Sequence, residues 1–216
     1  NGWAQTGPVT FEWEDEHVDP IVSDGENLYP VQKTADGAWL FRANAVPAKG
    51  WQGYAVLPRT DVKAKELICR ESGTLAASLH HLENDYLKVT LDPNGQFSSI
   101  YDKKAKRELL KAGKNGNVLM TYEDRPHNYD AWDVNNYYVE KSWEITDVQN
   151  LSLIEDGPLQ ATIQVVRRYL DSEITQYISL EADSPELKIR NEIDWREQKI
   201  FLKTLFPVDI HTDEAT

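Results

Sequence analysis

Asp130 and Asp133 are the two residues whose type and spacing first suggest catalysis. They are carboxylates three residues apart in an irregular segment, residues 128–138 (NYDAWDVNNYY). Paired carboxylates about 5–9.5 Å apart can hydrolyse a glycosidic bond. A chain with 36 Asp and Glu residues contains many acidic pairs that reach this spacing by accident. We therefore expect Asp130 and Asp133 to order the loop or to contact a substrate rather than to catalyse a reaction.

Aromatic rings are the second notable feature of residues 128–138. Tyr129, Trp132, Tyr137 and Tyr138 alternate with short Asp and Asn side chains. Such a mixture suits a sugar, which offers both C–H faces and hydroxyl groups. The alternative is a long loop whose aromatic rings plug one end of a β-sandwich while its polar residues cap turns, and composition alone favours this alternative.

Metal-binding and nucleophilic motifs are absent from the sequence. Its five histidines include the adjacent pair His80 and His81, which would point to opposite faces of a strand. No two histidines, and no two cysteines, have a metal-ligand spacing, and neither a nucleophile elbow nor a phosphate-binding glycine loop occurs. We expect no catalytic residue and no metal or other cofactor in this chain.

The net charge and the cysteine content limit which binding partners and which cellular compartment are expected. The formal net charge of −13 disfavours nucleic acid as a partner. No apolar run approaches the roughly 20 residues that a membrane helix needs. Cys69 is the single cysteine, so no internal disulfide can form, and a reducing, cytoplasmic location is expected.

The first third of the chain predicts a small β-sandwich, assigned to residues 1–76. Alternation over residues 9–13 indicates a half-buried strand, and residues 28–32 read as an edge strand interrupted by Pro30. A turn at Asp36-Gly37 leads into a strand over residues 39–43, and another strand follows near residues 54–57. Short strands at this spacing, without an amphipathic helix, are typical of an all-β domain.

Residues 77–216 predict a second, larger antiparallel unit. Asp92-Pro93-Asn94-Gly95 joins two strands of a hairpin, while residues 102–111 suggest a helical turn or a long loop. Longer strands follow over residues 161–169, 174–180, 187–195 and 201–208. In residues 187–195 the apolar and charged positions alternate so regularly that a one-residue slip would bury five charges.

Four stretches, in order along the chain, resemble segments of the glycoside hydrolase family 38 α-mannosidases of the bacterial and cytosolic-vacuolar type. They are residues 46–51 (VPAKGW), 82–89 with 95–102, 130–133 (DAWD), and 190–207, the last containing IDWRE, LK and FP. The resemblance covers nearly the whole chain. It departs from the family pattern at Arg196, where relatives often carry histidine.

The resemblance implies a small β-domain followed by part of a large galactose-mutarotase-like β-supersandwich. It also implies retaining hydrolysis of α-mannosides by an N-terminal α/β domain, which this chain lacks and which would hold the zinc ion and the aspartate nucleophile. The expected partners are therefore that catalytic domain and an α-mannoside. Within this chain, Asp130, Trp132 and Asp133 are the candidate substrate-binding residues.

Two alternatives to this scaffold role stay open. One is a free-standing carbohydrate-binding module, and the other is a structural sandwich without a ligand. We also expect the family's large β-domain to continue beyond Thr216, which would leave a strand edge unpaired. Such an edge would pair with a second copy of the chain and give a homo-oligomer.

Overall fold

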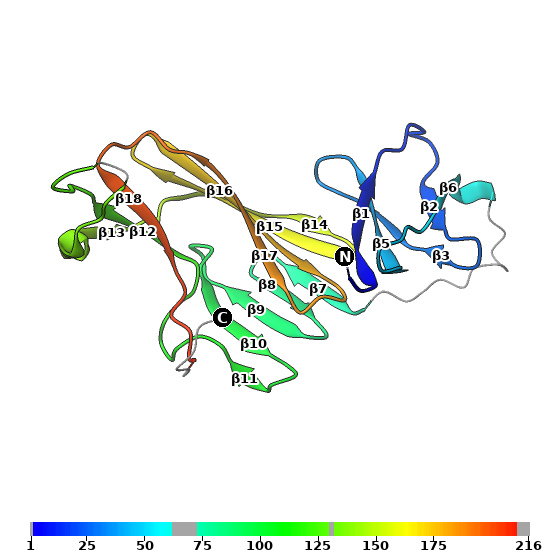
Figure 1. The fold of residues 1–216 in the computed structure, drawn as a ribbon, viewed down its shortest axis with the longest axis horizontal. Coiled ribbons are helices and arrows are strands. Elements are labelled where there is room, and N and C mark those ends of the chain that lie inside the picture. The colour runs from blue at the N-terminus through cyan, green and yellow to red at the C-terminus, as the bar shows by residue number, and fades with distance from the viewer. Residues whose placement is uncertain (1, 62–72, 130–131, 211–216) are drawn as a thin grey trace.

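The computed structural model describes residues 2–61, 73–129 and 132–210, which form antiparallel β-sheets and two short 3-10 helices (Figure 1). The predicted all-β class is thereby confirmed. Neither short helix is long and apolar enough to cross a lipid bilayer, and the described residues contain no other helix.

Two three-stranded sheets, β1-β5-β4 and β3-β2-β6, make up the first unit. Their elements are β1 (Gln5–Phe11), β2 (Pro20–Ser23), β3 (Leu28–Tyr29), β4 (Val31–Lys33), β5 (Trp39–Val46), β6 (Ala55–Pro58) and the 3-10 helix η1 (Arg59–Asp61). The core lies around Phe41, whose ring makes edge-on contacts with Phe11, Tyr29 and Tyr54. Such aromatic contacts concentrate much buried area in few residues, which suits a core this small.

Of two sequence predictions for this unit, one is confirmed and the other is wrong. Pro30 interrupts the strand as predicted, and the two halves, β3 and β4, belong to different sheets. The half-buried strand predicted over residues 9–13 is wrong in two respects, because β1 ends at Phe11 and Val9 is 41% exposed. Trp13 lies beyond the strand and donates its indole N–H to the carbonyl of Val18 at 2.7 Å.

Three sheets form the larger unit: β11-β10-β9-β8-β7, β14-β15-β16-β17 and β13-β12-β18. Their strands are β7 (Leu75–Ser78), β8 (His81–Asn84), β9 (Leu87–Leu91), β10 (Phe97–Asp102), β11 (Arg107–Glu108), β12 (Val118–Glu123), β13 (Ser142–Glu144), β14 (Val148–Asp156), β15 (Gln160–Tyr169), β16 (Ser172–Glu181), β17 (Leu187–Asp194) and β18 (Ile200–Leu205). The predicted hairpin β9–β10 and the long strands β15 to β18 are confirmed, and residues 102–111 contain a turn over residues 103–106 followed by the short strand β11.

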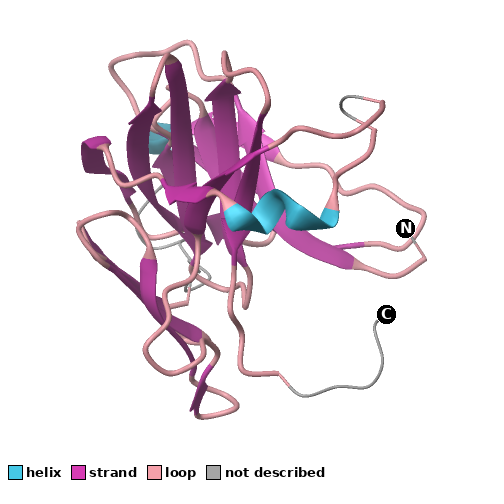
Figure 2. Ribbon diagram, turned by 90° about the vertical axis from the view of Figure 1, so that its left-hand side faces the viewer, coloured by secondary structure: helices cyan, strands magenta, loops and turns pink. Residues whose placement is uncertain are grey.

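The five-stranded and four-stranded sheets pack face to face around one core. Leu82, Val89 and Phe97 from the first sheet meet Ile163 and Ile178 from the second, and all five are fully buried. Figure 2, turned by 90° from Figure 1, shows the 3-10 helix η2 (Asn136–Glu140) in front of the strands. Two facing sheets with one shared apolar interior are the arrangement of a β-sandwich.

Arg167 is buried in this interior together with a polar network. Its guanidinium donates to the carbonyl of Asn94 at 2.6 Å and to the side-chain oxygen of Gln176 at 2.5 Å. Gln176 in turn exchanges hydrogen bonds with Asn117 and donates to Asn191. Burial lowers the pKa of Arg167 to about 10, since removing the cation from water penalises the charged form.

The two units are joined by side chains that cross between them. Gln32 on β4 donates to the carbonyl of Gln160 at 2.7 Å and accepts the backbone N–H groups of Leu159 and Gln160, both at 2.9 Å. Arg42 on β5 forms an ion pair of 2.9 Å with the buried carboxylate of Glu181. The side chain of Gln32 therefore satisfies backbone groups much as a neighbouring strand would.

Two predictions about the larger unit need comment. The apolar face of β17 is less covered than its alternation suggests, since Ile193 is 47% exposed. The register itself agrees with the predicted alternation, with Leu187 and Ile189 packed against the core. The boundary between residues 76 and 77 stays a prediction, and both residues lie in β7, which pairs with β8.

Candidate functional site

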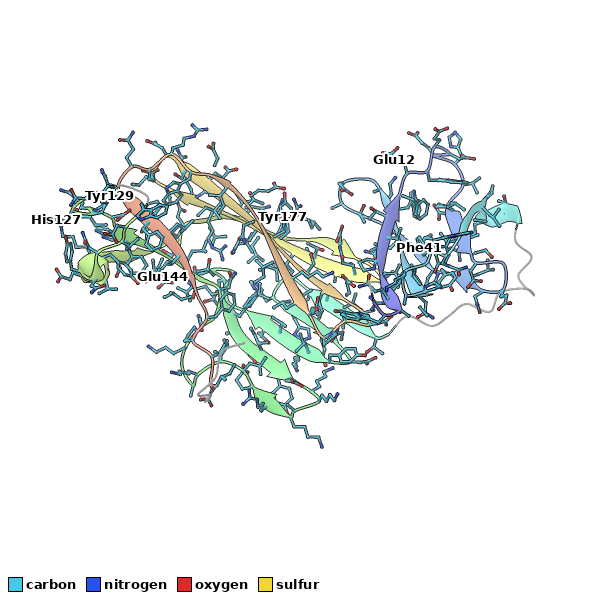
Figure 3. All side chains as sticks on the ribbon, in the orientation of Figure 1. Glu12, Phe41, His127, Tyr129, Glu144 and Tyr177 are labelled. Carbon is cyan, nitrogen blue, oxygen red and sulfur yellow. The ribbon has the colours of Figure 1, made fainter. Side chains whose placement is uncertain are left out.

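The irregular segment singled out in the sequence lies in a long hairpin loop, residues 124–141, between β12 and β13. These strands pair directly, with Thr121 opposite Trp143. The loop is closed at its base by Lys141, whose carbonyl accepts the N–H of Glu123 and whose ammonium group lies 2.8 Å from the carboxylate of Glu123. His127 and Tyr129 extend beyond the sheets at this end of the molecule (Figure 3).

Local hydrogen bonds order the described parts of the loop. Tyr129 has a φ of +59°, and its carbonyl accepts the N–H groups of Trp132 and Asp133 at 3.0 and 3.1 Å. Asn135 donates its side-chain amide to the hydroxyl of Tyr137 at 2.7 Å and accepts the N–H of Tyr138 at the start of η2. Backbone carbonyls thus make these turns, and the side chain of Asn135 does not cap η2, so the capping by short polar side chains that the alternative interpretation expected is not seen at this helix.

The aromatic rings of the loop do not plug the sandwich. Trp132 is 88% exposed, Tyr129 75% and Tyr137 50%, and only Tyr138 of the loop's aromatic residues is partly buried. The interpretation that composition favoured is therefore wrong for three of these four rings. Large exposed rings gathered on one loop are uncommon unless they serve an interface or a ligand.

The predicted substrate-binding residues are only partly visible. Trp132 and Asp133 are both exposed, on the solvent side of the loop. Asp130 lies outside the described residues, so its distance from Asp133 is not defined. The role of all three residues therefore stays a prediction.

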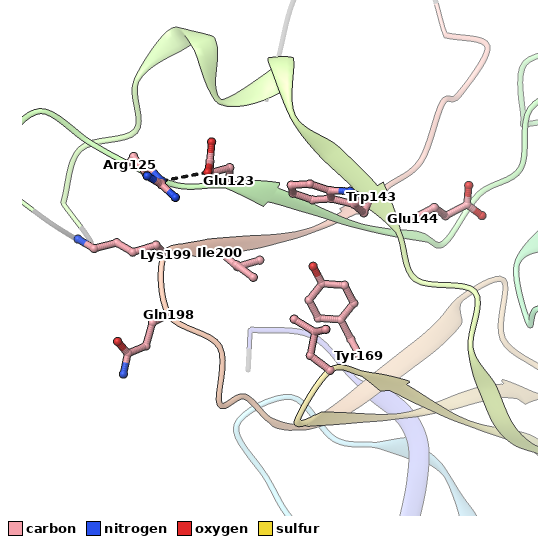
Figure 4. Close-up of a pocket in the computed structure, with 9 residues that line it drawn as sticks. Glu123, Arg125, Trp143, Glu144, Tyr169, Gln198, Lys199 and Ile200 are labelled. Carbon is pink, nitrogen blue, oxygen red and sulfur yellow. Dashed lines mark ion pairs between the residues drawn. The ribbon is translucent and has the colours of Figure 1, made fainter.

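A cavity of about 600 Å³ opens at the base of the same loop (Figure 4). The apolar part of its wall comes from Trp143 on β13, Tyr169 at the end of β15 and Ile200 on β18. Glu123 and Arg125 stand at its edge as an ion pair of 2.9 Å. Aromatic planes beside hydrogen-bonding groups are the lining that pyranose rings require.

Sequence reasoning missed the cavity, although some signals for it exist. Tyr169 stacks on Trp195 with parallel rings whose centroids are 5.9 Å apart, which presents Tyr169 to the cavity. The alternation in residues 187–195 marks Trp195 as inward, but nothing local pairs it with Tyr169. Trp143 is flanked by charged and polar residues and gave no signal of its own.

Glu123 at the base of the loop is paired with two cations. Lys141 and Arg125 hold the pKa of the Glu123 carboxyl below its ordinary value, Lys141 by a hydrogen bond foremost. Glu123 therefore stays ionised at neutral pH. Elsewhere in the described part of the chain, no three histidine, cysteine, aspartate or glutamate side chains lie close enough to hold a metal ion. The described residues thus do not fit a zinc site.

Known sequences agree with the resemblance seen in the motifs. The family profile described as "Glycosyl hydrolases family 38 C-terminal domain" matches residues 82–216. The chain belongs to glycosyl hydrolase family 38. This match covers the hairpin β9–β10, the loop 124–141 and the long strands, which are the parts that carry three of the four similar motifs.

Three similar curated proteins are α-mannosidases by name. "Alpha-mannosidase 2C1" of Homo sapiens is 28% identical over 137 residues, "Alpha-mannosidase G" of Dictyostelium discoideum 27% over 143, and "Alpha-mannosidase" of Saccharomyces cerevisiae 27% over 149. Each alignment covers 62% of this chain but only 13–14% of the relative. The chain therefore spans a small fraction of the length of the family 38 proteins that it matches.

Proposed function

We propose that this chain is a non-catalytic β-sheet part of a retaining α-mannosidase, and that its loop 124–141 forms one wall of the mannoside site. The observation that carries the proposal is the gathering of Trp132, Tyr129 and Tyr137, all at least half exposed, on one loop. The names of the related family 38 proteins supply the substrate class.

Sugar recognition by this loop would divide between rings and polar groups. Trp132 offers an open indole face to the C–H side of a pyranose, and Asp133 and Arg125 can bond to hydroxyl groups. The cavity beside Trp143 and Tyr169 would hold a further part of the substrate. Catalytic groups and the zinc ion are assigned in this proposal to a separate domain, and the cytoplasm is the proposed location.

Hydrolysis of a chromogenic α-mannoside tests whether the catalytic groups belong to a separate domain. We expect no turnover by residues 1–216 alone, and chelator-sensitive turnover by a polypeptide that joins them to a family 38 catalytic domain. Turnover by residues 1–216 alone would refute the proposal and direct attention to Asp130 and Asp133.

Trp132→Ala tests the loop within the active polypeptide. We expect at least a tenfold fall in kcat/KM, which corresponds to about 1.4 kcal/mol of lost transition-state binding. Trp51→Ala is the matched control, because Trp51 is 85% exposed but lies in the smaller unit. Equal effects of the two substitutions would show that the loop has no special part in binding.

The second candidate is a carbohydrate-binding module that acts without a catalytic domain. The same exposed rings favour it. Titration of residues 1–216 with α-1,2-mannobiose, followed by tryptophan fluorescence, separates the two proposals. Saturable quenching that Trp132→Ala abolishes would favour the module, and its absence would favour a wall completed by another domain.

A further inference from the structure

Tyr138 is the residue through which the 3-10 helix η2, in the loop 124–141, packs on the sheet β13-β12-β18. Of the five residues of η2, all of them described, Tyr138 is the one that is not exposed. Its ring lies edge-on to Tyr122, with centroids 5.1 Å apart, and to Phe201, 5.9 Å apart. These two rings stand opposite each other on β12 and β18, so the register of the sheet builds the socket for Tyr138.

Lys203 completes this contact from β18. Its ammonium group donates a hydrogen bond to the hydroxyl of Tyr138 and lies 4.4 Å from the centre of that ring. It also lies 5.3 Å from the centre of Phe201 and 5.9 Å from that of Tyr122. A cation close to aromatic rings is attracted to their electron-rich faces, more strongly when it is shielded from water.

The charge of Lys203 has no acidic partner at ion-pair distance among the described residues. The ion pairs found there join other lysines and arginines to carboxylates, such as Lys141 to Glu123. A surface lysine that served only solubility would keep its ammonium group in water. The ammonium group of Lys203 instead points at the one ring of η2 that packs on the sheet.

Among residues 124–129 and 132–141, the other bonds to the sheets lie at the base of the loop. Lys141 and Arg125 pair with Glu123, and Asp124 donates its N–H to the carbonyl of Lys199 at 2.8 Å. Trp132 and Asp133 donate their N–H groups to the carbonyl of Tyr129 within the loop, and Trp132 is 88% exposed. A segment with so few buried contacts opens easily unless one contact holds it.

We propose that Lys203 and Tyr138 are positioning residues that fix the loop 124–141 in the orientation in which Trp132 meets the substrate. The inference rests on the proposed function, because it assumes that the loop contacts a mannoside. Neither residue touches the sugar in this proposal. Their effect is to remove the entropy cost of ordering the loop when the substrate binds.

Lys203→Met is the first test, because methionine keeps most of the apolar stem and removes the charge and the donor. Hydrogen–deuterium exchange of residues 1–216 should become at least tenfold faster in residues 132–141, with no change in β14 to β17. Tyr138→Phe keeps the ring in its socket and should give a smaller increase. An unchanged loop in Lys203→Met would overturn the proposal.

Kinetics in the active polypeptide provide the second readout. We expect Lys203→Met to raise KM for the α-mannoside at least fivefold with kcat within twofold, since the loss lies in holding the bound substrate. Tyr177→Phe is the matched control, because Tyr177 also stacks with a cation, Arg190 at 3.9 Å, but on another sheet.

The outcomes separate this inference from the function on which it rests. A normal KM in Lys203→Met, beside impaired turnover in Trp132→Ala, overturns the positioning role and leaves the proposed function standing. Normal turnover in Trp132→Ala overturns the proposed function itself. Faster exchange throughout β12 and β18, rather than in the loop, would show that Lys203 stabilises the sheet and not the loop. This result would also overturn the positioning role.

Discussion

Replacing Gln32 with alanine should loosen the attachment between the two units of this chain. The Gln32 side chain is 6% exposed and makes three hydrogen bonds across the boundary, one to the carbonyl of Gln160 and two from the N–H groups of Leu159 and Gln160. Alanine removes all three bonds, and the N–H groups of Leu159 and Gln160 lose this acceptor, whereas the carbonyl of Gln160 keeps the N–H of Gly157 at 3.3 Å.

The expected cost follows from these contacts. A hydrogen bond contributes about 1 kcal/mol net, so the loss of three should cost about 3 kcal/mol of docking free energy. That is roughly a hundredfold in the equilibrium between docked and undocked units. The ion pair of Arg42 with Glu181 should survive, so we expect loosening and not complete separation.

Gly157 gives a second way to disturb the same contact. A Cβ atom on residue 157 would lie 2.1 Å from Cδ of Gln32, which is far inside van der Waals contact. Gly157→Ala should therefore displace Gln32 and cost a similar amount. When Gln32→Ala is already present, the obstructing atoms are gone, and Gly157→Ala should cost less than 1 kcal/mol more.

Amide exchange of Leu159 and Gln160, measured by NMR, reports on this contact directly, because their N–H groups are the ones that Gln32 accepts. We expect both to exchange about a hundredfold faster in Gln32→Ala. Gln149→Ala is the control, since Gln149 is an exposed glutamine that bonds to Asp147 within the larger unit. Strict additivity of the Gln32 and Gly157 substitutions would refute the reasoning.

Three further substitutions test the interior and a turn. Gln176→Leu removes the acceptor that the buried Arg167 uses, so urea titration should show a loss of about 3 kcal/mol, and no loss would contradict the network. Gly95→Ala should lower the melting temperature, because φ is +69° and the new Cβ would come within 2.7 Å of Val165, and an unchanged melting temperature would show that the turn adapts. Asp24 has a pKa below its ordinary value, foremost because Tyr29 donates to it at 2.6 Å. Its stabilisation is therefore complete above about pH 4 and declines as the pH falls below that value, so Asp24→Asn should weaken the acid dependence of urea unfolding.

Local patterns predicted the strands well where turn chemistry and alternation agree. Asp92-Pro93-Asn94-Gly95 indicated the hairpin β9–β10, and Gly95 indeed has the left-handed φ that such a turn needs. Prediction failed where alternation was not matched by burial. Val9 is apolar but exposed, because the sheet that contains β1 buries other positions.

The sequence predicted which segment contains the candidate site. It did not predict which side chains of that segment are exposed or which other strands line the site. Residues 128–138 stood out because rings and short polar side chains are mixed without strand or helix periodicity. Whether Trp132 is exposed or lies in the core is decided by packing, and the plugging interpretation that composition favoured is wrong for this ring, which is 88% exposed. Trp143 joined the site through the pairing of β13 with β12, and Tyr169 through packing against the cluster that contains Leu119 and Ile145. Lys203 reached Tyr138 through the pairing of β18 with β12.

The sequence by itself determined the all-β class, most strands of the larger unit and the similarity to family 38, since each follows from short local patterns of residues. Tertiary structure alone decided what satisfies the buried polar groups. Arg167 lies at alternate positions with Ile163 and Val165 along β15, which predicts that it points inward, but its partners Asn94 and Gln176 come from elsewhere in the chain. Hydrogen-bond partnership depends on three-dimensional neighbours, and local periodicity carries no record of them.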